Sequence, residues 1–223
     1  MLWRWLVLAG CAGVGLILAG AMLQLPEPPV RIAVQVDATL HASGVTSKVT
    51  AVLLNFRGYD TLLEIAVLLL ALIGVLAMAG DARSNSLRLS VSPQPILQSM
   101  TRVLAPLMML VAGYLLWAGS HRPGGAFQAG SVLAAGGVLL YLAGLLPAWA
   151  APGRLLRSGL AAGFMIFLAV AAGSMINGSM LQYPPRHAGA LILLIEAGLT
   201  VSLGLILAGL FLWLPNENEE AEE

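Results

Sequence analysis

The sequence predicts an all-α integral membrane protein with about six transmembrane helices. Two observations lead to this fold class. First, 59% of the 223 residues are hydrophobic and 10% are charged, whereas a soluble domain carries about 25% charged residues. Second, the apolar residues gather into six runs, each about long enough to cross a bilayer as a helix. Because so few polar side chains cannot cover a soluble surface, we expect the chain to lie in a membrane.

The six predicted spans share a dense apolar composition broken by polar loops. In chain order they are residues 6–25, 62–79, 96–118, 126–146, 158–176 and 188–214. A signal peptide is the alternative for the first run, since Ala19-Gly20-Ala21 resembles a small-residue cleavage site. Signal-peptide apolar regions are typically about 7–15 residues, so a retained helix is favoured.

The segment between the first two spans is the least regular part of the prediction. Pro26, Pro28 and Pro29 end the first helix, because proline cannot continue it. Residues 30–36 alternate weakly and are a candidate short strand. Residues 46–55 are apolar but too short to span, so we expect them to lie at the interface or to re-enter the membrane.

The loops predict the topology. An even number of spans places both termini on one side of the membrane. The two short loops on that side carry pairs of arginines close to the spans, which is where the positive-inside bias acts: Arg83, Arg88, Arg154 and Arg157. We therefore expect the protein in the cell (inner) membrane with cytoplasmic termini, and residues 215–223 as an acidic, disordered tail.

Small residues recur at helical spacing and predict close helix contacts. The pairs are Gly130 with Ala134, Gly159 with Gly163, and Gly204 with Ala208. Packing of such pairs drives helix association in lipid. Their density in residues 126–146 predicts that this helix has several close neighbours.

Two carboxylates, Glu64 and Glu196, lie within predicted spans. Ionisable groups in hydrocarbon are costly and mark functional sites. Glu196 is about 12 Å past Ala188 along a helix, near the midplane of a core about 30 Å thick. It either is neutralised by a neighbouring polar group or belongs to an ion or proton path. For Glu64 the alternative is a capping box with Thr61 at a helix start.

The other chemistry-bearing residues give weaker signals. Arg57 lies near the membrane edge and is expected to pair with Asp60 or with phospholipid, while His121 and His187 are expected to be solvated loop residues.

The chain lacks the sequence signatures of zinc proteases, hydrolases, phosphate loops and dinucleotide sites. Its 11 basic and 11 acidic residues balance, which argues against a nucleic-acid partner. We expect no enzyme activity, no cofactor and no metal site; the single cysteine, Cys11, allows no intrachain disulfide.

Two motifs resemble those of a known family. Residues 55–65, Asn-Phe-Arg-Gly-Tyr-Asp-Thr-Leu-Leu-Glu-Ile, resemble the D-F-R-G-F-D-T-x-x-E-I motif of Mrp-type multisubunit Na+/H+ antiporters. There it lies in the C-terminal part of the large MnhA-type protein, and it recurs in a small component of membrane-bound hydrogenases. Asn55 replaces the first aspartate.

Residues 123–130, Pro-Gly-Gly-Ala-Phe-Gln-Ala-Gly, resemble the P-G-G-G-F-Q-x-G motif of the MnhB-type antiporter protein, with Ala126 replacing the third glycine. Residues 191–198 are similar to the last helix of the MnhB-type protein, whose acidic residue is matched by Glu196.

The resemblance covers nearly the whole chain. Residues 1–88 look like the end of the MnhA-type protein and residues 92–214 look like the MnhB-type protein; they meet at the polar boundary of residues 80–95. This implies an accessory membrane subunit of a monovalent cation (Na+)/proton antiporter, with Na+, H+, the other subunits and the phospholipid bilayer as partners. The alternatives are a subunit of a membrane-bound hydrogenase or another energy-converting complex, and a purely structural scaffold.

The candidate site residues follow from these motifs. The pathway candidates are Glu64, Glu196, Asp60 and Arg57, and the lining or motif candidates are Thr61, Pro123, Gly124, Gly125, Phe127 and Gln128. Two glycines after a proline leave bare backbone N–H groups at a helix start. We hypothesise that Phe127 and Gln128 pack against the Glu64 region and that this junction lines the cation route.

Overall fold

The computed structural model describes residues 2–24, 32–79, 94–146, 154–176, 178, 180–184 and 186–212, and every regular element in these ranges is a helix. The elements in chain order are α1 (Leu2–Leu23), α2 (Ile32–Thr39), the 3-10 turn η1 (Leu40–Ala42), α3 (Lys48–Ala51), the π-helical turn η2 (Val52–Phe56), α4 (Gly58–Ala79), α5 (Pro95–Ala118), α6 (Ala126–Leu142), α7 (Arg154–Ser174) and α8 (Ala188–Leu212). The predicted all-α fold class is confirmed.

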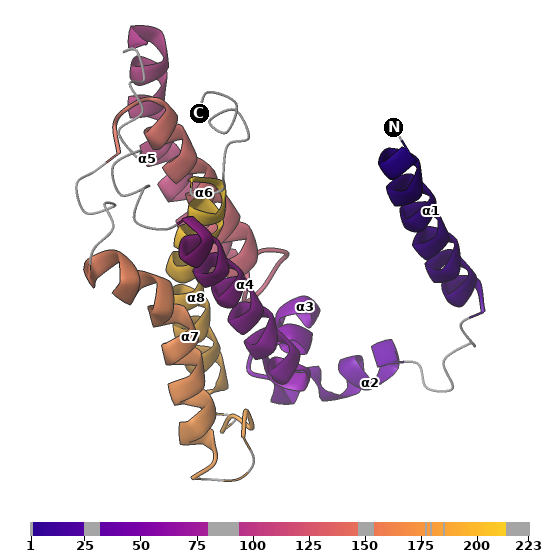
Figure 1. The fold of residues 1–223 in the computed structure, drawn as a ribbon. Coiled ribbons are helices and arrows are strands. Elements are labelled where there is room, and N and C mark those ends of the chain that lie inside the picture. The colour runs from indigo at the N-terminus through magenta and orange to yellow at the C-terminus, as the bar shows by residue number, and fades with distance from the viewer. Residues whose placement is uncertain are drawn as a thin grey trace. The chain divides into compact units, whose positions relative to one another are not determined.

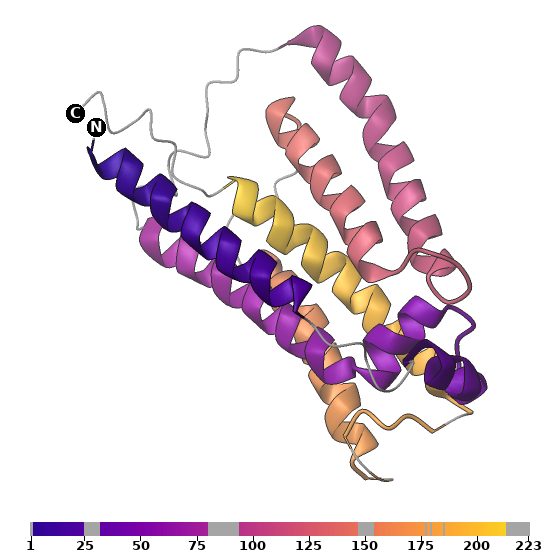
Figure 2. The same cartoon turned by 90° about the vertical axis from the view of Figure 1, so that its right-hand side faces the viewer.

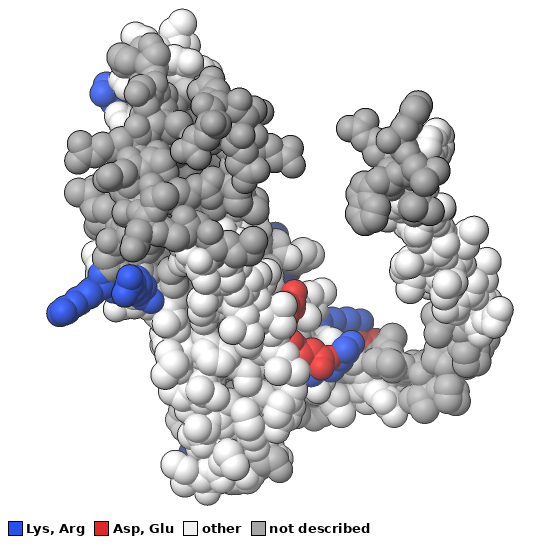
Figure 3. Space-filling model, in the orientation of Figure 1, with Lys and Arg blue, Asp and Glu red and all other residues white. Residues whose placement is uncertain are grey.

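Within the described residues, four helices are long and apolar enough to cross a membrane. They span Gly58–Ala77, Pro95–Ala118, Arg154–Ser174 and Ala188–Leu212. The other two predicted spans correspond to the shorter apolar helices Val7–Leu23 and Ala126–Leu142. The face shown in Figure 3 is largely free of charged side chains over its described surface, as a lipid-facing surface requires. The chain is thus a multi-pass membrane protein.

The chain forms two compact units, residues 1–35 and residues 36–223. The first unit contains α1, whose apolar composition is that of a helix in lipid. The second unit contains α4 to α8 and the functional candidates.

Helix α8 is the centre of the second unit. It packs against α6, α7 and α4, and α5 packs on α6 (Figures 1 and 2). Its inward residues are fully buried, among them Ile192, Ile195, Leu199, Leu203 and Ile206. A helix that is apolar on all sides, as α8 is apart from Glu196, Thr200 and Ser202, is expected in this central place.

Small residues let α6 and α7 approach α8 closely. A Cβ atom at Gly130 would lie 2.9 Å from Cβ of Leu203, and one at Gly163 would lie 2.6 Å from Cβ of Ser202. Any side chain at either position would force the helices apart. Ser202 also donates a hydrogen bond to the Leu160 carbonyl across the α7–α8 contact (2.5 Å). The predicted close packing of the fourth apolar run is confirmed.

Three parts of the chain meet at one end of the bundle: residues 43–57, the α5–α6 turn (residues 119–125), and residues 180–184 with 186–187. We call this the junction end. The backbone N–H groups of Thr46 and Ser47 donate to the Ser120 carbonyl (3.0 and 3.1 Å). Gly44, at a φ of 78°, lies against the start of α8, where its Cβ would be 2.5 Å from Cβ of Ala188.

Two of the alternatives left open by the sequence are wrong: the candidate strand at residues 30–36 and the capping box at Thr61. The candidate strand is helical where it is described, because α2 begins at Ile32; a helix pairs its backbone groups internally, while a lone strand leaves them unpaired. The capping box at Thr61 is also wrong. Helix α4 begins at Gly58, three residues earlier, and Thr61 instead donates to the Leu53 carbonyl (2.6 Å).

Residues 46–55, expected at the interface or re-entering the membrane, fold as the short helix α3 and the π-helical turn η2, which lead into α4. The sequence expectations for the boundary at residues 80–93 and for the acidic tail lie outside the described residues.

Candidate functional site

Among the described residues, Glu196 is the buried acidic side chain of the α4–α8 bundle. It lies on α8 and is 3% exposed. Its Oε2 atom has no hydrogen-bond partner among the described residues. A buried carboxylate left charged and unpaired costs several kcal/mol. Glu196 must therefore carry a proton, or be balanced by something that occupies the space beside it.

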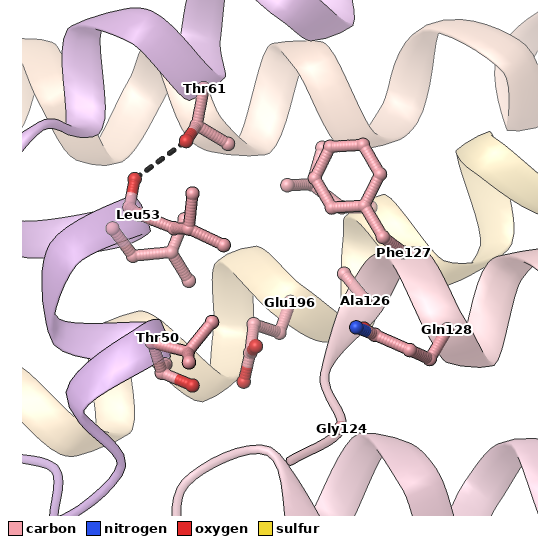
Figure 4. A pocket seen from close by; sticks show the side chains of 11 residues that line it. Thr50, Leu53, Thr61, Gly124, Ala126, Phe127, Gln128 and Glu196 are labelled. Atoms are coloured by element: carbon pink, nitrogen blue, oxygen red, sulfur yellow. Dashed lines mark hydrogen bonds between the residues drawn. The ribbon is translucent and has the colours of Figure 1, made fainter.

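A cavity of about 20 Å³ lies beside the carboxylate, which is room for about one water molecule. Figure 4 shows the side chains that surround it, with the Thr50 hydroxyl and the Gln128 amide on either side of Glu196. The lining residues are Val49, Thr50, Leu53, Leu54, Thr61, Gly124, Ala126, Phe127, Gln128, Glu196 and Leu199. Four of the side chains are polar, so the cavity suits a polar occupant.

The α5–α6 turn wraps around the carboxylate. Gly125 has a φ of 105°, a conformation that favours glycine. A Cβ atom there would lie 2.5 Å from Oε1 of Glu196, and one at Gly119 would lie 3.3 Å from the same atom. The backbone N–H of Ala126, at the start of α6, donates a hydrogen bond to the carboxylate. Free N–H groups at a helix N-terminus favour negative charge, so the turn is suited to an ionised Glu196.

Segment 47–61 closes the other side of the cavity. Thr50, on α3, donates to the Gly119 carbonyl (2.5 Å), which ties α3 to the α5–α6 turn. In η2, the N–H of Arg57 donates to the Val52 carbonyl (2.8 Å), the π-helical spacing. The Leu53 carbonyl, in the same turn, accepts from Thr61. Single π-helical turns occur frequently at functional sites.

The structure brings several of the predicted site residues together and separates others. Thr61, Gly124, Phe127 and Gln128 line the cavity with Glu196, and Gly125 lies against the carboxylate. Phe127 also packs on the core cluster that contains Leu62 and Ile65, which lie close to Glu64 in the chain.

Glu64 itself lies away from the cavity. It is exposed on α4, beside Leu63 (64% exposed) and Val67 (63% exposed). Arg57 and Asp60 form the expected ion pair, and both are exposed. Pro123 is exposed and outside the lining.

Sequence reasoning missed Ser47 and Thr50. Thr50 lines the cavity and is 3% exposed, and Ser47 is 7% exposed. Ser47 caps α3, since its hydroxyl accepts from the N–H of Thr50 (3.4 Å). The available signal was spacing: Ser43, Ser47 and Thr50 follow one another at intervals of four and three residues.

Three other polar side chains at the junction end lie outside the cavity lining. Burial raises the pKa of the Tyr183 hydroxyl, so it stays neutral at physiological pH, and it has no hydrogen-bond partner among the described residues. His121 is exposed and lies 6.0 Å from the ring of Trp117. His187 is also exposed. Among the described contacts, none of the three touches the Glu196 carboxylate.

Fold and site together define a multi-pass membrane protein with a buried carboxylate beside a cavity for one water. The model of a family described as "Domain related to MnhB subunit of Na+/H+ antiporter" matches residues 96–212. Because this match covers more than half of the chain, the chain belongs to the MnhB-related family. The predicted resemblance to antiporter subunits is confirmed.

A curated relative is a probable K(+)/H(+) antiporter protein of Rhizobium meliloti (strain 1021), whose name joins the A and B components. It is 29% identical over an alignment of 166 residues, and the match covers 63% of this chain and 17% of the relative. The chain therefore spans about a sixth of the length of that relative.

Two solved structures share the fold. A chain of the membrane-bound sulfane sulfur reductase, an archaeal respiratory membrane complex, matches with a TM-score of 0.73 at 23% identity, over 94% of this chain and 98% of that chain. A chain of the Mrp complex from Dietzia sp. DQ12-45-1b matches with a TM-score of 0.71 at 25% identity, over 96% of this chain and 26% of that chain.

Proposed function

We propose that this chain is a membrane subunit of a multisubunit monovalent cation/proton antiporter, and that Glu196 carries a proton or a cation at one step of the path. One observation carries the proposal: the buried Oε2 of Glu196 has no partner among the described residues and lies beside a cavity whose lining includes the polar side chains of Thr50, Thr61 and Gln128.

The chemistry of a buried carboxylate suits exchange. In a site that excludes bulk water, the charge must be balanced, so the carboxylate holds either a proton or a cation. Passing between these two states is the elementary step of an antiporter. The N–H of Ala126 offers the ionised state some stabilisation, so the ionised and the protonated states lie closer in free energy.

The relatives support this class. The names of the family and of the curated relative refer to Na+/H+ and K(+)/H(+) antiporters, so Na+ or K+ is the expected cation. The relative carries a joint A/B name, in agreement with residues 1–88 as an MnhA-like part and residues 92–214 as an MnhB-like part. The expected partners are the other subunits of the complex.

The position of Glu64 also supports a complex. Its carboxylate is exposed on a membrane-spanning helix among apolar side chains. Facing lipid, a charged carboxylate would cost several kcal/mol. A polar surface of a neighbouring protein over this face of α4 would remove that cost and would extend the path beyond this chain.

A second candidate is a subunit of a respiratory or hydrogenase-type membrane complex. The observation that favours it is the fold match over 98% of a chain of the sulfane sulfur reductase complex. In such a complex the same carboxylate would move ions in response to electron transfer rather than to a cation gradient.

The test is to remove this chain from its host and to purify the tagged protein gently from native membranes. The antiporter assignment predicts that antiporter subunits co-purify and that everted vesicles lose cation-driven proton movement, which the restored gene returns. Co-purification with iron–sulfur or hydrogenase subunits would instead establish the second candidate. Unchanged proton movement in the deletion strain would refute the antiporter assignment.

A further inference from the structure

We propose that protons, rather than metal cations, reach Glu196 from the junction end, and that they pass through the hydroxyl groups of Ser47 and Thr50. This inference rests on the proposed role of Glu196 and names the species that uses this branch of the path.

The two hydroxyl groups lead from the cavity toward the surface. Thr50 lines the cavity with Glu196, and its Oγ1 is 3.2 Å from Oγ of Ser47. Both side chains are nearly fully buried, but Thr46, which precedes Ser47 in the chain, is exposed. The step from the cavity to the edge of the buried region is therefore made by two hydroxyl groups in hydrogen-bond contact.

The hydrogen bonds of Ser47 and Thr50 leave both hydroxyl groups able to pass a proton on. The Thr50 hydroxyl is placed to donate either to the Ser47 oxygen (3.2 Å) or to the Gly119 carbonyl (2.5 Å). Because a hydroxyl has one proton and the shorter bond goes to Gly119, Ser47 can donate its own proton to the Thr50 oxygen. A hydroxyl has one proton and two acceptor sites, so rotation about the C–O bond turns the Thr50 proton toward the cavity without moving a heavy atom.

The transfer is balanced at each step. Ser47 gives its proton to the Thr50 oxygen, Thr50 gives its own proton to a water in the cavity, and that water protonates the Glu196 carboxylate. Ser47 is then reprotonated from solvent. One proton moves from solvent to the carboxylate, and no group changes its oxidation state.

The same geometry excludes a metal cation from this branch. Ser47 and Thr50 are 7% and 3% exposed and their hydroxyl oxygens are in direct hydrogen-bond contact at 3.2 Å, so the packing around them leaves no passage for an ion. A proton needs no such space, because it crosses by exchange of hydrogen bonds. A cation that balances Glu196 must arrive by another branch.

The experiment uses the whole complex in everted vesicles with three variants. Thr50→Val removes the hydroxyl and keeps the shape, Thr50→Ser keeps the hydroxyl, and Thr46→Val is the matched control. Thr46 lies in the same segment and also donates to a carbonyl, that of Ser120 (3.2 Å), but lies outside the cavity lining. Cation-driven proton movement, exchange of labelled Na+ or K+ at equal pH on both sides, and the abundance of the complex are measured.

We expect Thr50→Val to slow proton movement by about tenfold or more, with exchange of the labelled cation and the abundance of the complex unchanged. Thr50→Ser and Thr46→Val should move protons at the native rate. If Thr50→Val reduces the abundance of the complex, Ser47→Ala is used with the same expectation.

Native proton movement in both Thr50→Val and Ser47→Ala would overturn the route. An equal loss of proton movement and of labelled-cation exchange in Thr50→Val, without rescue by Thr50→Ser, would also overturn it, since the residue would then only hold the site in place. Glu196→Gln, measured in parallel, separates the two claims. Native exchange in Glu196→Gln refutes the proposed function, whereas its loss together with normal Thr50→Val refutes the route alone.

Discussion

Gly125 and Glu196 share a space that admits no further atom. A Cβ atom at position 125 would lie 2.5 Å from Oε1 of Glu196, well inside van der Waals contact. The φ of 105° at Gly125 adds strain for any other residue, about 1–3 kcal/mol. The double glycine of the α5–α6 turn therefore both shapes the turn and makes room for the carboxylate.

Gly125→Ala is expected to displace the carboxylate and to reduce cation/proton exchange strongly. Gly113→Ala, in the neighbouring helix α5, is the control, because a Cβ there meets nothing within 4 Å. Exchange in vesicles, normalised to the amount of complex, checks the prediction. Native exchange in the Gly125→Ala variant would show that the turn can move away from Glu196.

Phe127→Ala is expected to impair exchange while the complex still assembles. Phe127 lines the cavity from the start of α6 and is only partly buried. Its removal opens the cavity to further water, so the carboxylate is no longer confined. Phe211→Ala, on α8 and 56% exposed, is the control for loss of an aromatic ring. Equal exchange in the two variants would mean that Phe127 only fills space.

The contact between α7 and α8 gives a prediction on stability. Gly163→Ala places a Cβ 2.6 Å from Cβ of Ser202, and overpacking of this kind costs about 1–3 kcal/mol. Gly173→Ala in the same helix meets nothing within 4 Å and should be neutral or stabilising. Thermal unfolding of the purified protein in detergent compares them. Equal melting temperatures would mean that the helices separate at little cost.

Topology is tested by reporter fusions. Fusions after Arg88 and Arg157 should report the cytoplasm, and fusions after Lys48 and Arg122 should report the outside. The short loops with paired arginines lead to this orientation. The junction end, which contains Lys48 and Arg122, would then face outward. A cytoplasmic signal at Lys48 would reverse the orientation.

Much of the fold is readable from the sequence, because lipid imposes a simple rule on composition. Apolar runs must be helical to pair their backbone groups, so the positions of α4 to α8 follow from hydropathy. The close packing at Gly130 and Gly163 follows from small residues at helical spacing. The short segment before α4 does not follow this rule, which is why its pattern suggests a strand where α2 forms.

The candidate site can be predicted from the sequence only in part, for a different reason. Glu64 and Glu196 have the same signature, a carboxylate in an apolar run, yet one is exposed and the other is buried. In a helix that is apolar on all sides, no periodicity tells which face has neighbours. The contact of Thr50 with Gly119 joins residues 69 positions apart, so it depends on how the helices assemble and not on local pattern.

The most direct measurement of the role of Glu196 is cation/proton exchange by Glu196→Gln in vesicles, with the amount of assembled complex determined in the same preparation. Glutamine keeps the shape and removes the titrating group, and a neutral amide is easier to bury than an ion. We predict normal assembly and exchange that is abolished or strongly reduced, with Leu193→Gln, on the exposed side of α8, as the control for a new amide. Full exchange by the assembled Glu196→Gln complex would contradict this role.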